Sequence, residues 1–162
     1  MTKVTVKRSE WLRGGRSTSQ TEDCTGYLYT TQHNNVGIGH FDGACADYRR
    51  KDVETTSAPG RCCLGFWCNA LGVADSDMKD CPSPAELFQK YAVDNREHEL
   101  PEAMVEVLHT TVHQDGSKTA YNQAAINMLI QINDEMEMGD PERERRLITF
   151  GKDAGIDFTF VD

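Results

Sequence analysis

The sequence lacks a long apolar run, and it has little positive charge relative to its negative charge. No stretch approaches the roughly 18 apolar residues of a membrane-spanning helix. The first ten residues, MTKVTVKRSE, contain no apolar segment of the roughly 7–15 residues that a secretory signal needs. Lys and Arg number 17 against 26 Asp and Glu, a formal charge of −9. A long nucleic acid requires a basic face, so this class of partner is not expected, and the absences together predict a soluble, cytoplasmic protein.

Two common site motifs are also missing. There is no GxxxxGK[ST] phosphate loop and no tight C-x2-C pair of the kind that holds structural zinc. In a reducing compartment, buried free thiols are the simplest interpretation of the six cysteines. No cofactor is expected, and the length of 162 residues suits one domain.

Strands are expected at both ends of the chain. Lys3–Lys7 alternates with Val4 and Val6 on one face, and 156–161 alternates with Ile156, Phe158 and Phe160 on one face. We expect these two strands to pair with each other or to join a small sheet. Ser9 is expected to cap a short helical turn that precedes Trp11 and Leu12.

About five helices are expected between the strands. They are predicted over 62–71, with Cys63, Phe66, Trp67 and Ala70 inward; over 84–91, capped by Ser83; after Pro101; from Ser117 or Thr119 to about Asn133; and from an Asp140 N-cap to near Gly155. The fourth helix is expected to bury Ala120, Ala124, Ala125, Met128, Leu129 and Ile132, and the fifth carries Leu147, Ile148 and Phe150. Residues 109–116 are predicted as turn or loop, and 142–146 as a solvated helix face.

Residues 16–60 are polar and show no helical period, which predicts an irregular or hairpin-bearing insertion. Tyr27–Thr31 has strand-like composition, while His33-Asn34-Asn35 has turn chemistry. The predicted fold class is therefore α+β: a single domain, 1–162, with a small sheet that includes the paired terminal strands, packed against about five helices, and with the insertion at 16–60.

Several short motifs carry a resemblance. They are Ser9-Glu10-Trp11-Leu12-Arg13-Gly14, Arg61-Cys62-Cys63-Leu64-Gly65-Phe66, Ile132-Asn133-Asp134-Glu135, Arg143-Glu144, and Gly155-Ile156 before the closing strand. Together they resemble a family of small uncharacterised proteins of tailed bacteriophages and prophages. The resemblance implies a viral protein that acts in the bacterial cytoplasm, but it assigns no catalytic residue.

The main predicted site binds a small anion. Residues 11–17 combine a glycine pair, Gly14 and Gly15, with Arg13 and Arg16, and arginine forks match phosphate oxygens. Aromatic side chains at Trp11, Tyr27, Tyr29 and Trp67 are candidates for stacking on a base. The setting implied by the resemblance favours a sponge, which is an anti-defence protein that sequesters a nucleotide-derived immune signal without catalysis. Calorimetry with cyclic nucleotides would test this hypothesis.

Asn133 and Asp134 complete the predicted ligand-binding set. They end the longest predicted helix, where acidic groups oppose the helix dipole. This placement favours a special role, such as a hydrogen bond to Trp11 or to the insertion. The alternative is a helix C-terminal cap.

A cysteine hydrolase is the second hypothesis. Cys62 or Cys63 would be the nucleophile at a helix N-terminus, with His33 or His40 as the base. This order, His before Cys, is similar to that of circularly permuted papain-like hydrolases. A third hypothesis is an acidic inhibitor that binds a host protein, which requires the acids to gather on one face. Homo-oligomers are expected in the sponge hypothesis.

A metal site is a further alternative. Cys24, His33, His40 and Cys45 lie in a loop-rich region, which structural zinc could organise. Scattered histidines and cysteines produce such quartets by chance, so the main prediction includes no metal.

Overall fold

The computed structural model describes residues 1–13, 28–29, 33–36, 53–56, 59–79, 81–135 and 138–162, with the backbone alone at 33–36 and 53–56. Its elements, in chain order, are β1 (Thr2–Lys7), η1 (Arg8–Glu10), β2 (His33–Val36), β3 (Val53–Thr56), α1 (Cys63–Ala70), α2 (Asp75–Met78), α3 (Pro84–Val93), η3 (Glu97–Glu99), α4 (Glu102–Val105), β4 (Leu108–Val112), β5 (Lys118–Asn122), α5 (Ala124–Asp134), α6 (Asp140–Gly151), η4 (Lys152–Ala154) and β6 (Ile156–Val161). The α+β prediction is confirmed. No helix in these ranges is long and apolar enough to span a bilayer.

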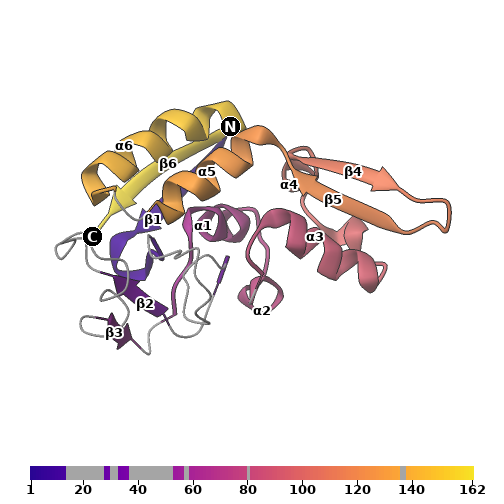
Figure 1. The fold of residues 1–162 in the computed structure, drawn as a ribbon, viewed down its shortest axis with the longest axis horizontal. Helices are drawn as coiled ribbons and strands as arrows, with labels where there is room; N and C mark the ends of the chain where they lie inside the picture. Colours follow the sequence, from indigo (N-terminus) through magenta and orange to yellow (C-terminus); the bar gives the residue numbers. More distant parts are fainter. Residues whose placement is uncertain (14–27, 30–32, 37–52, 57–58, 80, 136–137) are drawn as a thin grey trace.

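The terminal strands pair with each other, as predicted, and they run parallel (Figure 1). Val4 lies opposite Phe158, and Val6 lies opposite Phe160. Val4, Val6, Ile156 and Phe158 are buried, so the alternating apolar residues form one inward face. Helix α6 packs beside β6, and Gly151 of α6 lies so close to the sheet that a Cβ there would be 2.7 Å from the Phe158 ring.

Helix α1 passes through the centre of the molecule. All residues from Cys63 to Cys68 are buried, whereas Ala70 is exposed. The predicted inward position of Ala70 is therefore wrong: α1 is apolar all round while it crosses the core, and its last turn reaches the surface. Gly65 allows a close approach, because a Cβ there would lie 1.7 Å from the carbonyl oxygen of Leu28.

Helix α3 begins as predicted. The Ser83 hydroxyl oxygen accepts a hydrogen bond from the Glu86 N–H at 3.3 Å, and Pro84 occupies the first turn. At the chain's start, Arg8–Glu10 forms a 3-10 turn, but the Ser9 side chain does not cap it.

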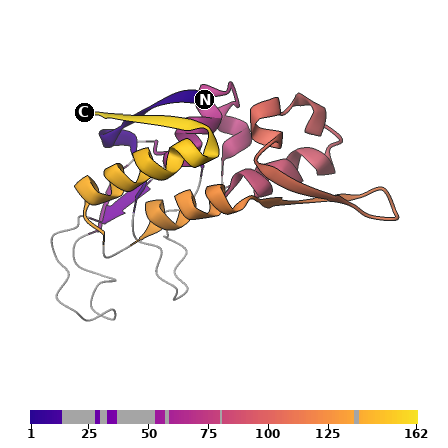
Figure 2. The same cartoon turned by 90° about the horizontal axis from the view of Figure 1, so that it is seen from above.

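The prediction for 109–123 is wrong. β4 and β5 form an antiparallel hairpin from Leu108↔Asn122 to Val112↔Lys118, and α5 begins only at Ala124. The turn between the strands contains Asp115-Gly116, with Gly116 at φ 83°, which is a common hairpin signal. The hairpin projects from the body of the molecule (Figure 2).

The late start of α5 changes which of its residues are inward. Ile126, Leu129, Ile132, Asn133 and Asp134 are the buried ones. Ala124 and Met128, predicted as core, are exposed, and Ala120 is buried from β5 instead. The predicted apolar stripe is wrong because it applied one helical period to the whole of 120–132, although Ala120 belongs to strand β5 and the helix begins only at Ala124.

Helix α6 begins at Asp140, but Gly139 occupies the N-cap and the Asp140 carboxylate bonds elsewhere. Leu147 is buried, whereas Ile148 and Phe150 are each 36% exposed. Gly155 ends the following turn in the left-handed region at φ 72°. The predicted solvated face at 142–146 is also wrong at one position, because Arg143 is completely buried.

The insertion contains a described hairpin. β2 pairs antiparallel with β3, from His33↔Thr56 to Val36↔Val53. The predicted turn at His33-Asn34-Asn35 is therefore wrong, since this segment is a strand. Of the predicted strand at 27–31, the described residues are Leu28 and Tyr29, and Tyr29 forms an isolated parallel bridge with Lys79.

Candidate functional site

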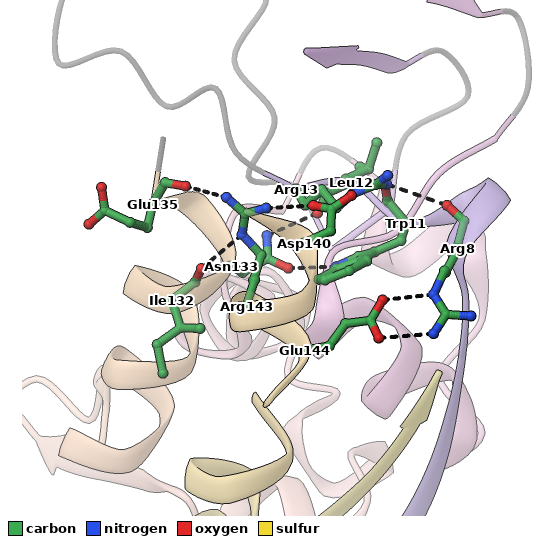
Figure 3. Close-up of polar contacts among 10 residues, drawn as sticks. All are labelled: Arg8, Trp11, Leu12, Arg13, Ile132, Asn133, Glu135, Asp140, Arg143 and Glu144. Atoms are coloured by element: carbon green, nitrogen blue, oxygen red, sulfur yellow. Dashed lines mark hydrogen bonds and ion pairs between the residues drawn. The ribbon is translucent and has the colours of Figure 1, made fainter. Parts of the chain in front are cut away.

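Trp11 and Asn133 are joined in the core rather than open to a ligand (Figure 3). Trp11 is 0% exposed, and its Nε1 donates to Asn133 Oδ1 at 2.9 Å. The same Oδ1 accepts from the Cys63 N–H at 3.1 Å, while Asn133 Nδ2 donates to the Leu12 carbonyl at 2.9 Å. The predicted contact of this helix end with Trp11 is confirmed, and it joins the N-terminal segment, α1 and α5.

The arginine forks near the N-terminus already bind carboxylates. Arg13 Nε donates to Asp140 Oδ2 at 2.8 Å, and its guanidinium carbon lies 5.0 Å from the centre of the Trp11 ring. Arg8 binds Glu144 with two nitrogens, at 2.7 and 2.9 Å, and Asp162 at 2.8 Å. Arg13, the described arginine of the predicted phosphate site, is thus held by a carboxylate of α6, and its neighbour Arg8 is held by carboxylates of α6 and of Asp162.

Arg143 is a central polar residue that the sequence analysis missed. Its side chain is 0% exposed, and burial lowers its pKa. It donates to Asp140 Oδ1 at 2.8 Å, to the Ile132 carbonyl at 3.2 Å and to the Glu135 carbonyl. Arg143 therefore satisfies backbone carbonyls at the end of α5 from the first turn of α6. The charge pattern around it gave no sign of burial.

The other described members of the predicted ligand site are buried or already in contact with another side chain. Trp67 is 1% exposed, Asp134 is 9% exposed, and Tyr29 is half-buried beneath Arg61, whose guanidinium carbon lies 5.2 Å from its ring centre. Arg61 in turn binds Glu10 at 2.9 Å and Asp75 at 2.6 Å. The remaining members, Gly14, Gly15, Arg16 and Tyr27, lie outside the described residues.

The cysteines proposed as nucleophiles do lie at a helix N-terminus, but they are buried. Cys62 is the N-cap of α1 and Cys63 its first residue. Burial raises the pKa of Cys62 from 9.0 to about 12 and raises that of Cys63 well above 9.0. The space beside them, bounded also by Pro82, Ile130 and Asn133, admits no water molecule. This environment favours the protonated thiol, whereas a nucleophile requires the thiolate.

The histidines and the metal alternative fall largely outside the described residues. These include His40, Cys24 and Cys45, and His33 is described by its backbone in β2 alone. Within the described ranges, no three His, Cys, Asp or Glu side chains are grouped so that they could hold a metal ion.

An open groove lies at the other end of the molecule, between the end of α3 and the tip of the β4–β5 hairpin. Its volume is about 420 Å³, within the range of pockets that bind ligands. It is lined by Gln89, Ala92, Val93, Asn95, Glu97, Asp115, Gly116, Ser117 and Lys118. Sequence reasoning missed this groove because it depends on the hairpin, which was predicted as a loop and a helix.

Two carboxylates give the groove its charge. Glu97 Oε1 accepts from Lys118, which lowers the pKa of Glu97. Glu97 Oε2 is buried and has no hydrogen-bond partner among the described residues. Asp115 accepts from the Ser117 hydroxyl at 2.6 Å and from the Ser117 N–H at 2.9 Å, which lowers its pKa. Both groups therefore stay anionic at neutral pH.

The groove belongs to an acidic lobe, which we define as residues 72–123. This segment contains ten acidic and four basic residues, a net charge of −6 out of −9 for the whole chain. Glu86, Asp94, Glu102 and Glu106 are exposed, and none has an ion pair in the described part of the chain. α2 and α3 hold together within the lobe, since the Tyr91 hydroxyl donates to Asp77 at 2.8 Å. The lobe is therefore an electrostatically distinct surface.

No protein family, curated protein or solved structure matches this chain. The resemblance to phage and prophage proteins stays a prediction, and function is argued below from the geometry.

Proposed function

We propose that this chain binds the basic segment of another protein through the groove of its acidic lobe. The carrying observation is the pair of anionic carboxylates, Glu97 and Asp115, at one groove in a lobe of charge −6. A lysine or arginine side chain would pair with the exposed part of the Glu97 carboxylate, whose side chain is 24% exposed. Within the described residues Glu97 has one ion-pair partner, Lys118, so the carboxylate has room for a second cationic donor.

This proposal develops the hypothesis of an acidic inhibitor rather than that of a nucleotide sponge. Arg13, the described arginine of the predicted nucleotide site, binds Asp140, and a phosphate would have to displace that carboxylate. A basic ligand at the acidic lobe displaces nothing except the Lys118 ammonium, which neighbours Glu97. Long-range attraction by the lobe would also speed the encounter with a basic partner.

The test is fluorescence anisotropy with a labelled arginine- and lysine-rich peptide, compared with a glutamate-rich peptide of the same length, at physiological salt. We expect saturable binding of the basic peptide alone. Glu97→Gln is expected to weaken it about tenfold, the loss of one charge-assisted hydrogen bond. Asp115→Asn should weaken it less, because Asp115 already accepts two hydrogen bonds from Ser117.

Two further variants separate site binding from general attraction and from misfolding. Lys118→Met removes the competing ammonium and is expected to strengthen binding severalfold, which an unfolded variant would not do. Asp153→Asn removes one exposed acid outside the lobe and should leave binding unchanged. Absence of saturable binding, or equal losses for Glu97→Gln and Asp153→Asn, would overturn the proposal.

A further inference from the structure

Helix α3 and strand β5 lie side by side and run in opposite directions (Figure 1). At the base of the hairpin, the Ala85 N–H of α3 donates to Asn122 Oδ1 at 3.0 Å. One helical turn later, the Gln89 amide, oriented to satisfy both groups, accepts from the Ala120 N–H at 2.6 Å and donates to the Lys118 carbonyl at 3.2 Å. Four helical residues advance about 6 Å and two strand residues about 7 Å, so the two elements stay in step toward the hairpin turn.

Val93 continues this series at the last residue of α3. It lies one turn beyond Gln89, and it lines the acidic groove together with residues of the hairpin turn. Its side chain is nevertheless 81% exposed. The groove therefore combines carboxylates with an apolar side chain that is open to solvent.

Val112 is a second exposed apolar side chain beside the groove. It lies opposite Lys118 in the hairpin, so both side chains leave the same face. From this face the Lys118 side chain reaches Glu97 in the groove. Val112 is 65% exposed, and apart from Met1 the two valines, Val93 and Val112, are the most exposed large apolar side chains in the described part of the chain. Both lie at the groove that holds the Glu97–Lys118 ion pair.

Charge alone would give this groove little selectivity. An exposed carboxylate binds a cation weakly at physiological salt, because water and counterions screen the attraction. Specific protein interfaces combine polar contacts with apolar side chains that become covered on binding. Single exposed valines are common on protein surfaces, but two at one charged groove form a surface that a segment with both basic and apolar side chains would cover.

We infer that the bound segment carries apolar side chains next to its basic ones, and that these cover Val93 and Val112 while a basic side chain pairs with Glu97. This inference rests on the proposed function, since it names the chemistry of the segment that binds the same groove. Such a segment fits better than a second copy of this chain, because a second copy would bring another lobe of charge −6 toward the groove.

Two labelled peptides of equal length and equal charge test the inference by fluorescence anisotropy. Both contain the same arginines, which are separated by leucines in one peptide and by serines in the other. We expect the leucine peptide to bind about tenfold more tightly, because its side chains and the two valines remove apolar surface from water together. At about 1 M salt, where the Debye length is about 3 Å, both peptides should bind more weakly while the preference for leucine persists.

Substitutions at the two valines locate this preference. Val93→Thr and Val112→Thr each keep the branched shape and replace one methyl group by a hydroxyl. Each should reduce the preference for leucine about threefold and leave the affinity for the serine peptide unchanged. Tyr121→Thr is the matched control, since Tyr121 is 60% exposed but pairs with His109 on the opposite face of the hairpin, and it should leave the preference unchanged.

The thermal midpoint of each variant confirms that it is folded. Equal affinities of the two peptides for the original chain would overturn the inference and leave the proposed function standing, whereas failure of both peptides to bind would overturn both. A preference for leucine that persists when Val93→Thr and Val112→Thr are combined, or one that Tyr121→Thr reduces equally, would also overturn the inference. In sedimentation velocity without peptide, a dimer that the combined variant abolishes would mean that a second copy covers the valines, which contradicts the inference.

Discussion

The buried side-chain amide of Asn133 connects separate segments of the chain through hydrogen bonds. Its two polar atoms satisfy the Trp11 indole N–H, the Cys63 N–H and the Leu12 carbonyl, which come from two segments far from it in the chain. The side chain is 1% exposed, so water cannot replace it as a partner. Removing it leaves three buried polar groups unpaired.

Asn133→Ala is therefore expected to lower the free energy of unfolding by about 3–5 kcal/mol, since each unpaired buried group costs roughly 1–3 kcal/mol. Urea denaturation followed by tryptophan fluorescence measures this loss. Asn127→Ala is the matched control: Asn127 lies on the same helix and is exposed, and in the described structure its side chain bonds only to Asn122. A loss equal to that of the control would show that the Asn133 contacts contribute little.

At the scale of elements, close backbone contact and buried charge decide how helices meet. Arg143 joins the start of α6 to the end of α5 through carbonyls of Ile132 and Glu135. Gly65 lets the chain at Leu28 lie directly on α1, and the Leu28 N–H donates to the Cys81 carbonyl at 2.7 Å. These contacts set the packing around α1 and between α5 and α6.

Gly65→Ala is expected to destabilise the protein by about 3 kcal/mol or more, because the added methyl meets backbone that cannot rotate away. Thermal unfolding is the measurement. At Gly139, the nearest atom to an added Cβ is 4.0 Å away, so Gly139→Ala should cost less than about 1 kcal/mol. Equal midpoints for the two variants would mean that the Leu28 segment moves aside freely.

The hairpin shows why one stretch could not be assigned from its period alone. Ala120 and Ile132 match a helical stripe if the chain between them is continuous. Two other signals favour a hairpin instead. The β-branched pair Thr110-Thr111 favours a strand, and Asp115-Gly116 favours a turn that leads into a second strand. Tertiary contact with α3 resolves this competition, because Ala120 is buried from β5 and Gln89 satisfies its backbone.

The whole molecule separates two kinds of electrostatic environment. Toward the terminal strands, Arg8, Arg13 and Arg143 bind carboxylates of α6. Toward the hairpin, the lobe at 72–123 leaves several carboxylates without a basic partner among the described residues. Between them lie three buried thiols, those of Cys62 at the N-cap of α1 and of Cys63 and Cys68 within α1, and burial raises the pKa of all three.

These thiols predict how stability depends on pH. The pKa of Cys62 rises from 9.0 to about 12 on folding, so both states are protonated below pH 9 and this thiol contributes no slope there. Above pH 9 the unfolded thiol ionises while the folded one does not. The free energy of unfolding should then fall toward pH 12, by about 1.4 kcal/mol per pH unit for each such thiol.

Urea titrations between pH 7 and about 10.5 measure this slope. Cys62→Ala is expected to reduce the slope above pH 9 by about 1.4 kcal/mol per pH unit, while the flat region near pH 7 shifts by a constant amount. The lysines, tyrosines and other cysteines are the same in both proteins. Identical slopes would show that Cys62 ionises as easily in the folded protein as in the unfolded chain.

The sequence by itself determined those secondary-structure elements whose signals lie within a few neighbouring residues. The alternation at Val4/Val6 and Ile156/Phe158 produced the terminal strands, and Ser83-Pro84 produced the start of α3, because these signals act over a few residues. The helix end at Asn133 was also marked, since acids there oppose the dipole.

Only the tertiary structure decided what each polar side chain binds. Trp11 and Asn133 are 122 residues apart, and Arg8 and Glu144 are 136 apart. An arginine offers the same fork to a phosphate and to a carboxylate, so sequence could not say which it meets. Packing the terminal strands against α6 brought the carboxylates to Arg8 and Arg13, and packing the hairpin against α3 created the acidic groove.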